Sequence, residues 1–191
     1  DLTTSFDENY SRTPLVFVGV GTDRNPGISF PHLNDINSQG FDLSLLGETN
    51  QTAVVDEEYT YLSMLPGRYF TEGAFSWEAG AIEMTSLSAS IEFSTAFAGI
   101  PKVFLSLQSG DGEQRLLVET NLVSESGVSF QLNPLEGAAI TGFDPVVLGY
   151  LAVYEPNSDG STVVNDVETG FSLHDILVSD EWNAELTTPF R

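Results

Sequence analysis

Oxygen-bearing side chains recur at regular intervals late in the sequence, in the stretch Glu155-Pro156-Asn157-Ser158-Asp159-Gly160. Glu155, Asn157, Asp159 and Asp166 occupy positions 1, 3, 5 and 12 of a loop that has glycine at position 6. Calcium prefers hard oxygen ligands, and calcium loops of this length use a glycine for their sharp turn. The spacing therefore predicts a Ca²⁺ site. Because position 1 is Glu, Pro156 stiffens the loop and no flanking helix is evident, a Gly-rich linker is the alternative interpretation.

The two tryptophans, Trp77 and Trp182, are candidates for binding carbohydrate, since the flat face of an exposed indole can support a sugar ring. They lie in related segments, because Gly73-Ala74-Phe75-Ser76 recurs as Gly170-Phe171-Ser172. A tryptophan that packs in a core or between two domains is the competing interpretation.

Residues for catalysis are scarce. The chain has two histidines, His32 and His174, and no cysteine. No nucleophile elbow, P-loop or His-Glu-x-x-His motif occurs. His32 follows Pro31 at a predicted strand end, where an ordinary surface histidine is the simpler interpretation. The acidic run Asp56-Glu57-Glu58 is an exposed hairpin loop or a cation site. We therefore expect a protein that is not an enzyme.

The charge of the chain restricts its partners. Six Lys and Arg face 28 Asp and Glu, which gives a net charge of −22, and the acidic residues are spread over both halves. Binding to phosphate groups needs Lys and Arg, so neither nucleic acid nor an anionic lipid surface is an expected partner. No apolar run approaches the 20 residues of a membrane span. An acidic extracellular surface is expected, either plain or neutralised by calcium.

Strands must position these side chains. Val16, Val18 and Val20 alternate with other residues, as do Val103, Leu105 and Leu107. A period of two with β-branched residues predicts β-strands. Turn sequences such as Asn25-Pro26-Gly27 and Ser126-Gly127 separate the runs, and no segment keeps a helical period. About six strands per unit favour a β-sandwich.

The same patterns recur along the chain, which predicts a tandem repeat. Pro14 to Val20 matches Pro101 to Leu107, and Ser38 to Leu45 matches Glu125 to Leu132, both 87 residues later. Tyr61 to Met64 matches Tyr150 to Val153, 89 residues later. A signature of the type Leu-Thr-Thr-Ser-Phe is read three times, in residues 1–6, 92–97 and 185–190. On this reading Leu2 matches Phe93, 91 residues later.

The repeat predicts an all-β chain with two tandem antiparallel β-sandwich units and the entry strand of a third. The first unit spans 1–70, the second 71–169, and residues 170–191 form the extra entry segment. The expected cores are apolar faces of matching strands: Val18, Val20, Leu43, Leu45, Leu62 and Met64 in the first unit, and Leu105, Leu107, Phe130, Leu132, Leu151 and Val153 in the second.

Each unit resembles the H-type lectin domain, the fold of snail agglutinins and of the C-terminal domain of discoidins. The resemblance rests on a strand ending in Phe, a Pro before a hydrophobic strand, a Gly-aromatic turn and a closing strand. In the second unit these are Phe97, Pro101-Lys102-Val103-Phe104, Gly127-Val128 and Tyr150-Leu151-Ala152-Val153. In the first they are Phe6, Pro14, Gly40-Phe41 and Tyr61-Leu62-Ser63-Met64.

The resemblance implies six-stranded antiparallel sandwiches, trimers and binding of sugars similar to N-acetylgalactosamine. The sugar-binding residues of the family do not carry over. Its Arg would fall near Glu119 and His32, and its Trp-His pair near Leu135-Glu136 and Glu48-Thr49. Similar divergent units also occur in long arrays in secreted bacterial surface proteins, and this use fits the chain better.

We therefore expect a non-catalytic extracellular module of a fibre, stalk or adhesive surface layer. Its partners would be copies of itself or adjacent repeats, joined head-to-tail when residues 170–191 pair with the first unit of a neighbour. A disordered tail is the alternative for these residues. The residues expected to make this contact are Leu2, Phe6, Trp182, Leu186 and Phe190. A carbohydrate-binding adhesion module, dependent on calcium, is the alternative.

Overall fold

The computed structural model of this protein describes residues 2–7, 9–20, 29–47, 59–70, 75–109, 116–134, 143–155, 162–164 and 167–169. Every regular element in these ranges is a β-strand, and every strand pairing is antiparallel. The prediction of an antiparallel all-β fold is confirmed. The expected entry segment, residues 170–191, lies outside the described residues.

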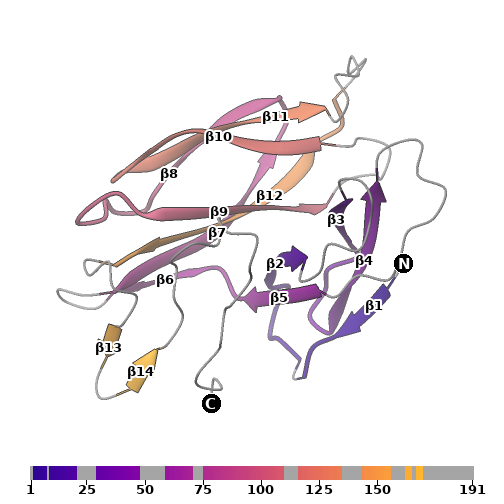
Figure 1. The fold of residues 1–191 in the computed structure, drawn as a ribbon, viewed down its shortest axis with the longest axis horizontal. Helices are drawn as coiled ribbons and strands as arrows, with labels where there is room; N and C mark the ends of the chain where they lie inside the picture. The colour runs from indigo at the N-terminus through magenta and orange to yellow at the C-terminus, as the bar shows by residue number, and fades with distance from the viewer. Residues whose placement is uncertain are drawn as a thin grey trace.

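Strands β7 to β12 form two facing sheets, which we call the second repeat. They are β7 (Ser76–Met84), β8 (Ser88–Glu92), β9 (Lys102–Ser109), β10 (Leu116–Ser124), β11 (Gly127–Pro134) and β12 (Val146–Tyr154). One sheet has the order β10-β11-β8, and the other has the order β6-β7-β12-β9, with β6 (Gly67–Phe70) at its edge. Figure 1 shows the two sheets as layers, with β8, β10 and β11 above β9, β12 and β7. Alternate residues of each strand fill the space between them, including Met84, Ile91, Phe130 and Leu148.

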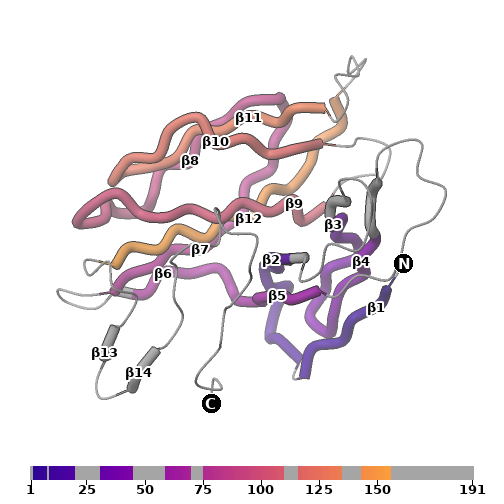
Figure 2. The backbone as a smooth tube through the Cα atoms, viewed as in Figure 1, coloured from indigo at the N-terminus to yellow at the C-terminus, as the bar shows by residue number. Residues whose placement is uncertain are grey.

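Strands β1 to β5 form the first repeat. They are β1 (Leu2–Ser5), β2 (Leu15–Val20), β3 (Ser29–Asn34), β4 (Gly40–Gly47) and β5 (Tyr59–Met64). One sheet has the order β1-β4-β3, and the other contains β2 and β5. Phe6, Val16, Leu33, Phe41 and Leu43 form its buried core. Figure 2 shows this repeat, in indigo and violet, beside the magenta and orange second repeat.

Pairing registers correspond between strands of the first repeat and strands of the second. Ser5 pairs with Gly40 in the first repeat, and Glu92 pairs with Gly127 in the second. A Cβ atom on either glycine would collide with a backbone oxygen of the neighbouring strand, Thr4 O or Ile91 O respectively. The same close approach therefore requires glycine at both positions, which are 87 residues apart.

The predicted match of residues 1–6 with residues 92–97 is wrong by four residues. Equivalent backbone hydrogen bonds lie 87 residues apart: Phe6 N–H to Gln39 O and Phe93 N–H to Ser126 O at 2.9 Å, and Tyr10 N–H to Ser38 O and Phe97 N–H to Glu125 O at 2.8 Å. Each repeat contains two aromatic rings that meet edge to face, with centroids 5.0 Å apart for Phe6–Tyr10 and 5.1 Å apart for Phe93–Phe97. The sequence match paired the first ring of one repeat with the second ring of the other.

The predicted core is correct on most strands and wrong on the closing strands. Leu43, Phe130 and Leu132 are buried in their cores, and Val18, Leu105 and Leu107 are partly buried against them. On β12, however, Tyr150 and Ala152 face the core of the second repeat, and Leu151 and Val153 face the opposite side. Leu62 is exposed and Met64 lies with Leu151 and Val153. The side chains of Val20 and Leu45 lie outside the described residues.

Leu151 and Val153 are buried because the two repeats pack together. They form an apolar cluster with Leu15, Phe75 and Ala79, and Phe17, Met64, Trp77 and Phe104 pack against it. The buried side-chain amide of Gln108 on β9 also pairs with the backbone of Val16 on β2. Val16 N–H donates to Gln108 Oε1 and Gln108 Nε2 donates to Val16 O, both at 2.8 Å. This amide satisfies a backbone edge that would otherwise be buried without partners.

Beyond the repeats, β13 (Thr162–Val164) and β14 (Val167–Thr169) form a two-stranded ladder. Strand β6 falls inside the predicted first unit, 1–70, but hydrogen-bonds to β7 of the second repeat. It is the connection through which the chain passes from one repeat to the next.

Candidate functional site

The outer edge of β5 is the main difference between the repeats. In the second repeat, the closing strand β12 lies between β7 and β9. In the first repeat, the equivalent strand β5 pairs with β2, the counterpart of β9, in the same register: Phe17 with Leu62 and Phe104 with Leu151. Within the described residues, no strand takes the place of β7 beside β5. Among the described strands, β5 therefore pairs on one side only, with β2.

Equivalent side chains on the closing strands β5 and β12 differ in their exposure. Tyr61 is 41% exposed, whereas its counterpart Tyr150 is 8% exposed. Leu62 is 42% exposed, whereas Leu151 is 7% exposed. The first repeat therefore exposes apolar side chains whose counterparts are covered in the second, Tyr150 by the core of that repeat and Leu151 by the cluster between the repeats.

A cavity of about 250 Å³ lies at the same place in the first repeat, between its two sheets. Its lining includes Leu2, Val18, Phe41, Leu43, Tyr59 and Tyr61. The counterparts of these six residues are Ala89, Leu105, Val128, Phe130, Leu148 and Tyr150, all within or against the core of the second repeat. That core also contains Met84 and Ile82, which β7 supplies. The cavity therefore occupies the position that β7 side chains fill in the complete repeat.

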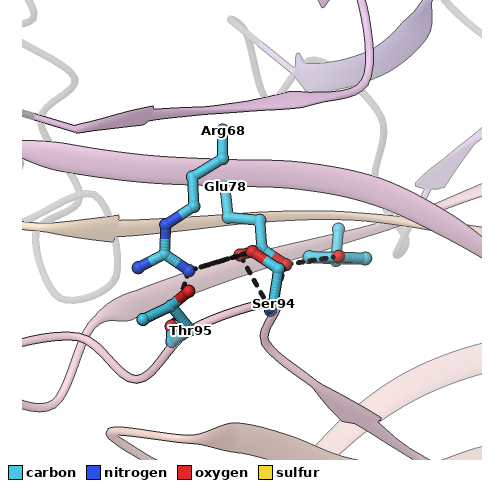
Figure 3. A network of polar contacts seen from close by, with 5 residues as sticks. Arg68, Glu78, Ser94 and Thr95 are labelled. Carbon is cyan, nitrogen blue, oxygen red and sulfur yellow. Dashed lines mark hydrogen bonds and ion pairs between the residues drawn. The ribbon is translucent and has the colours of Figure 1, made fainter.

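A buried ionic network lies where β6 meets the second repeat. Glu78 on β7 is 5% exposed. Its Oε2 accepts hydrogen bonds from Arg68 Nη1 at 2.6 Å and Ser94 Oγ at 2.6 Å, and its Oε1 accepts from Tyr150 O–H at 3.0 Å. Ser94 N–H donates to both oxygens, at 3.0 and 3.1 Å. Figure 3 shows Arg68 and Ser94 pointing toward the Glu78 carboxylate.

Arg68 makes further contacts that attach β6 to the loop after β8. Its Nη1 donates to Thr95 O at 2.5 Å and to Ser94 Oγ at 3.2 Å. Its guanidinium carbon lies 4.7 Å from the centroid of the Phe97 ring, within the range of a cation–π interaction. Arg68 thus joins the connection between the repeats to the core of the second repeat.

The network shifts two pKa values. Burial raises the pKa of the Glu78 carboxyl, but hydrogen bonds from Ser94, Tyr150 and Arg68 outweigh burial and leave this pKa below its ordinary value of 4.5. Burial and the hydrogen bond to the Glu78 carboxylate raise the pKa of Tyr150 from 10.0 to about 12. Glu78 is therefore ionised and Tyr150 is neutral at physiological pH. Because protein donors occupy both carboxylate oxygens, this arrangement suits packing of β6 better than proton transfer.

The sequence-based analysis missed this network, although two signals were present. Arg68 is one of six basic residues in the chain. Glu78 lies on an alternating strand in phase with Ser76 and Met84, which are buried. A charged residue at an inward position implies a buried partner.

The predicted calcium ligands remain largely untested. Glu155 directly follows β12, and Asn157, Asp159 and Asp166 lie outside the described residues. The acidic run Asp56-Glu57-Glu58 also lies outside them. No group of three or more potential metal-binding side chains occurs in the part of the chain that the structure describes.

The predicted carbohydrate and assembly residues occupy different environments. Trp77 stacks on Tyr69, with ring centroids 6.2 Å apart, and packs against the cluster between the repeats. Leu2 is exposed and lines the β5 cavity, whereas Phe6 is buried in the first core. Trp182, Leu186 and Phe190 lie outside the described residues, as does His174.

Two of the positions that the family resemblance assigns to sugar binding, Glu119 and His32, lie in described strands and are polar. Glu119 on β10 accepts hydrogen bonds from Gln131 Nε2 at 2.9 Å and Asn133 Nδ2 at 2.6 Å on the exposed side of its sheet. On β3, His32 Nδ1 lies 3.0 Å from Asn34 Nδ2. Leu135-Glu136 and Glu48-Thr49 lie outside the described residues.

A scan against protein-family models and searches of curated proteins and solved structures find no match to this chain. The resemblance to the H-type lectin domain therefore stays a prediction. Among the described residues, no helix is long and apolar enough to cross a membrane.

Proposed function

We propose that this chain is a non-catalytic module of an acidic extracellular fibre, stalk or surface layer, and that modules join when a β-strand of one binds the β5 edge of the next. The observation that carries the proposal is that β5 pairs on one side only among the described strands, with Tyr61 exposed where Tyr150 is buried. Strand addition supplies affinity through main-chain hydrogen bonds, and pockets for alternate side chains supply specificity. The β5 edge and its cavity offer both.

Repetition supports a role in an array. The two repeats pack through an apolar cluster and through the Gln108–Val16 pair, so they form a stacked unit rather than two separate domains. The Gln108–Val16 pair also joins positions that are not equivalent, because the counterpart of Val16 is Val103. Contacts between unlike surfaces do not close by two-fold symmetry and can extend into filaments.

The carbohydrate-binding alternative has less support from the described residues. Trp77 is one of its two candidates, with Trp182, and the Trp77 ring is engaged with Tyr69 and the cluster between the repeats. A sugar platform requires an open aromatic face.

Sedimentation of the full chain over a range of concentrations and salt tests the proposal. We expect multimers that grow with concentration, and more of them at high salt, because salt screens repulsion between chains of charge −22. Tyr61→Lys should abolish assembly by placing an ammonium group in the apolar groove. Leu122→Lys is the matched control, because Leu122 is an exposed residue of β10 in the second repeat. A full chain that stays monomeric up to about millimolar concentration at high salt would show that the proposal is wrong.

A further inference from the structure

The connection between β1 and β2 contains an acceptor sequence for N-linked oligosaccharides. Asn9-Tyr10-Ser11 has the form Asn-x-Ser, in which x is any residue except proline. The enzymes that attach oligosaccharides use the side-chain amide of the asparagine and require the hydroxyl group at the third position. Asn9 and Ser11 are both exposed, whereas Tyr10 is partly buried. The two groups that such a transferase must reach therefore lie at the surface of the first repeat.

The middle residue of this sequence is anchored to the first repeat. Tyr10 N–H donates to Ser38 O at 2.8 Å, and Tyr10 O–H donates to Ser63 O at 3.0 Å. The Tyr10 ring meets the Phe6 ring edge to face and packs against the core of the first repeat. Because these contacts hold the tyrosine inward, the residues on either side of it are presented to solvent at a fixed place on the surface.

The second repeat forms the same connection without an acceptor sequence. Phe97, the counterpart of Tyr10, makes the equivalent backbone hydrogen bond and the equivalent ring contact. The residues on either side of it are Ala96 and Ala98, which are both exposed. The fold therefore needs an aromatic residue at the centre of this connection but neither an amide nor a hydroxyl group beside it. Packing does not explain the acceptor sequence of the first repeat.

We propose that Asn9 is an N-glycosylation site and bears an oligosaccharide in the exported protein. This inference rests on the extracellular location in the proposed function and adds a covalent modification to it. An exposed connection between strands suits such a group, because an N-linked oligosaccharide is bulky and solubilising and needs a position at the surface.

The donor is an oligosaccharide bound to a lipid diphosphate. The Asn9 amide nitrogen forms a bond to the anomeric carbon of this oligosaccharide, and the bond from that carbon to the diphosphate oxygen breaks. The electron pair of the broken bond leaves with the lipid diphosphate, and one amide proton passes to a base of the transferase. No oxidant or reductant is needed.

Site-resolved mass spectrometry of the full chain, exported from a host that N-glycosylates its own secreted proteins, tests the proposal. A second acceptor sequence, Asn50-Gln51-Thr52, lies outside the described residues, so the two sites must be measured separately. Trypsin separates them, because it cleaves after Arg12, Arg24 and Arg68. The peptide that ends at Arg12 should bear an oligosaccharide, which peptide N-glycosidase releases while it converts Asn9 to aspartate.

Two substitutions at one position separate glycosylation from a structural effect. Ser11→Ala removes the required hydroxyl group and should abolish glycosylation of Asn9, whereas Ser11→Thr keeps that group and should preserve glycosylation. When the chain is produced without glycosylation, neither substitution should change the midpoint of urea unfolding, because the second repeat has Ala98 at this position.

Molecules are selected by the oligosaccharide on an appended flexible tag that has its own acceptor sequence, so every molecule measured has met the transferase. An unmodified Asn9 in these molecules overturns the proposal, as does equal glycosylation of Ser11→Ala and Ser11→Thr. Both results leave the proposed function standing, because sedimentation of the wild-type chain and of Tyr61→Lys tests assembly independently. A chain that is glycosylated at Asn9 but never assembles would refute the proposed function alone.

Discussion

Replacing Glu78 by glutamine should strongly destabilise the second repeat. The glutamine keeps one acceptor oxygen but turns the other position into an NH₂ donor. That donor would face Arg68 Nη1, Ser94 Oγ or Ser94 N–H, all of which donate hydrogen bonds to the native carboxylate. The substitution also leaves the Arg68 guanidinium, whose side chain is 17% exposed, without its counter-charge.

The size of the effect follows from the burial of this pair. Removing one partner of a buried ion pair costs about 3–5 kcal/mol, because the remaining charge is left uncompensated. For a chain of this length, each kcal/mol lowers the melting temperature by about 2–4 °C, so the expected decrease is about 6–20 °C. Partial solvent access to Arg68 places the result toward the lower end of this range.

Urea and thermal unfolding followed by circular dichroism measure this change. Glu83→Gln is the matched control, because Glu83 is an exposed residue of the same strand. It should alter stability by less than about 0.5 kcal/mol. If Glu78→Gln and Glu83→Gln unfold at the same urea concentration, the network does not stabilise the fold and the reasoning from burial is refuted.

Three further predictions concern the same contacts. Because the folded-state pKa of Tyr150 is raised from 10.0 to about 12, stability should be full below pH 10 and fall as the pH rises toward 12. Tyr150→Phe should remove this alkaline loss, as pH-dependent melting will show. Gln108→Leu should leave a buried backbone N–H and C=O unpaired and destabilise the contact between the repeats by about 1–3 kcal/mol per group, measured by urea unfolding. If residues 155–166 bind calcium, a hundredfold excess over Kd should stabilise the chain by about 2.7 kcal/mol; scanning calorimetry with magnesium and sodium controls should then show a rise in melting temperature that Asp159→Asn abolishes.

The class of fold and most of the repeat could be predicted from local sequence patterns. Alternating apolar residues identify strands wherever one face is buried and the other is solvated, as in β11, where Val128, Phe130 and Leu132 all face the core. The glycines Gly40 and Gly127 allowed β4 to be matched with β11, 87 residues later, because the close approach of the neighbouring strand requires glycine at both positions. Both signals depend on residues that are close together in the chain, so they can be recognised in a single sequence.

The face that a strand presents to the core could not be predicted where both faces are apolar. On β12 the run Tyr150-Leu151-Ala152-Val153 has no polar side to mark its outer face, because the second repeat packs against the first. The choice of Leu151 and Val153 as core residues was therefore off by one position. The Arg68–Glu78 pair was missed for a related reason, since it joins residues on different strands, which local periodicity does not connect.

The pair Tyr61 and Tyr150 shows why burial in such a chain depends on neighbouring repeats. Both tyrosines lie on a closing strand, where Tyr61 pairs with Val18 and Tyr150 pairs with Leu105, the counterpart of Val18. Both also approach the first aromatic ring of their repeat, with centroids 6.3 Å apart for Phe6–Tyr61 and 6.4 Å apart for Phe93–Tyr150. They differ because β7, the strand that covers Tyr150, reaches the second repeat from the end of the first. Completion of a repeat thus depends on the chain before it, and in proteins of this kind stability comes from interfaces between neighbours as well as from each unit. Filling the β5 edge should therefore stabilise the first repeat most, since that repeat exposes the apolar surface that β7 covers in the second.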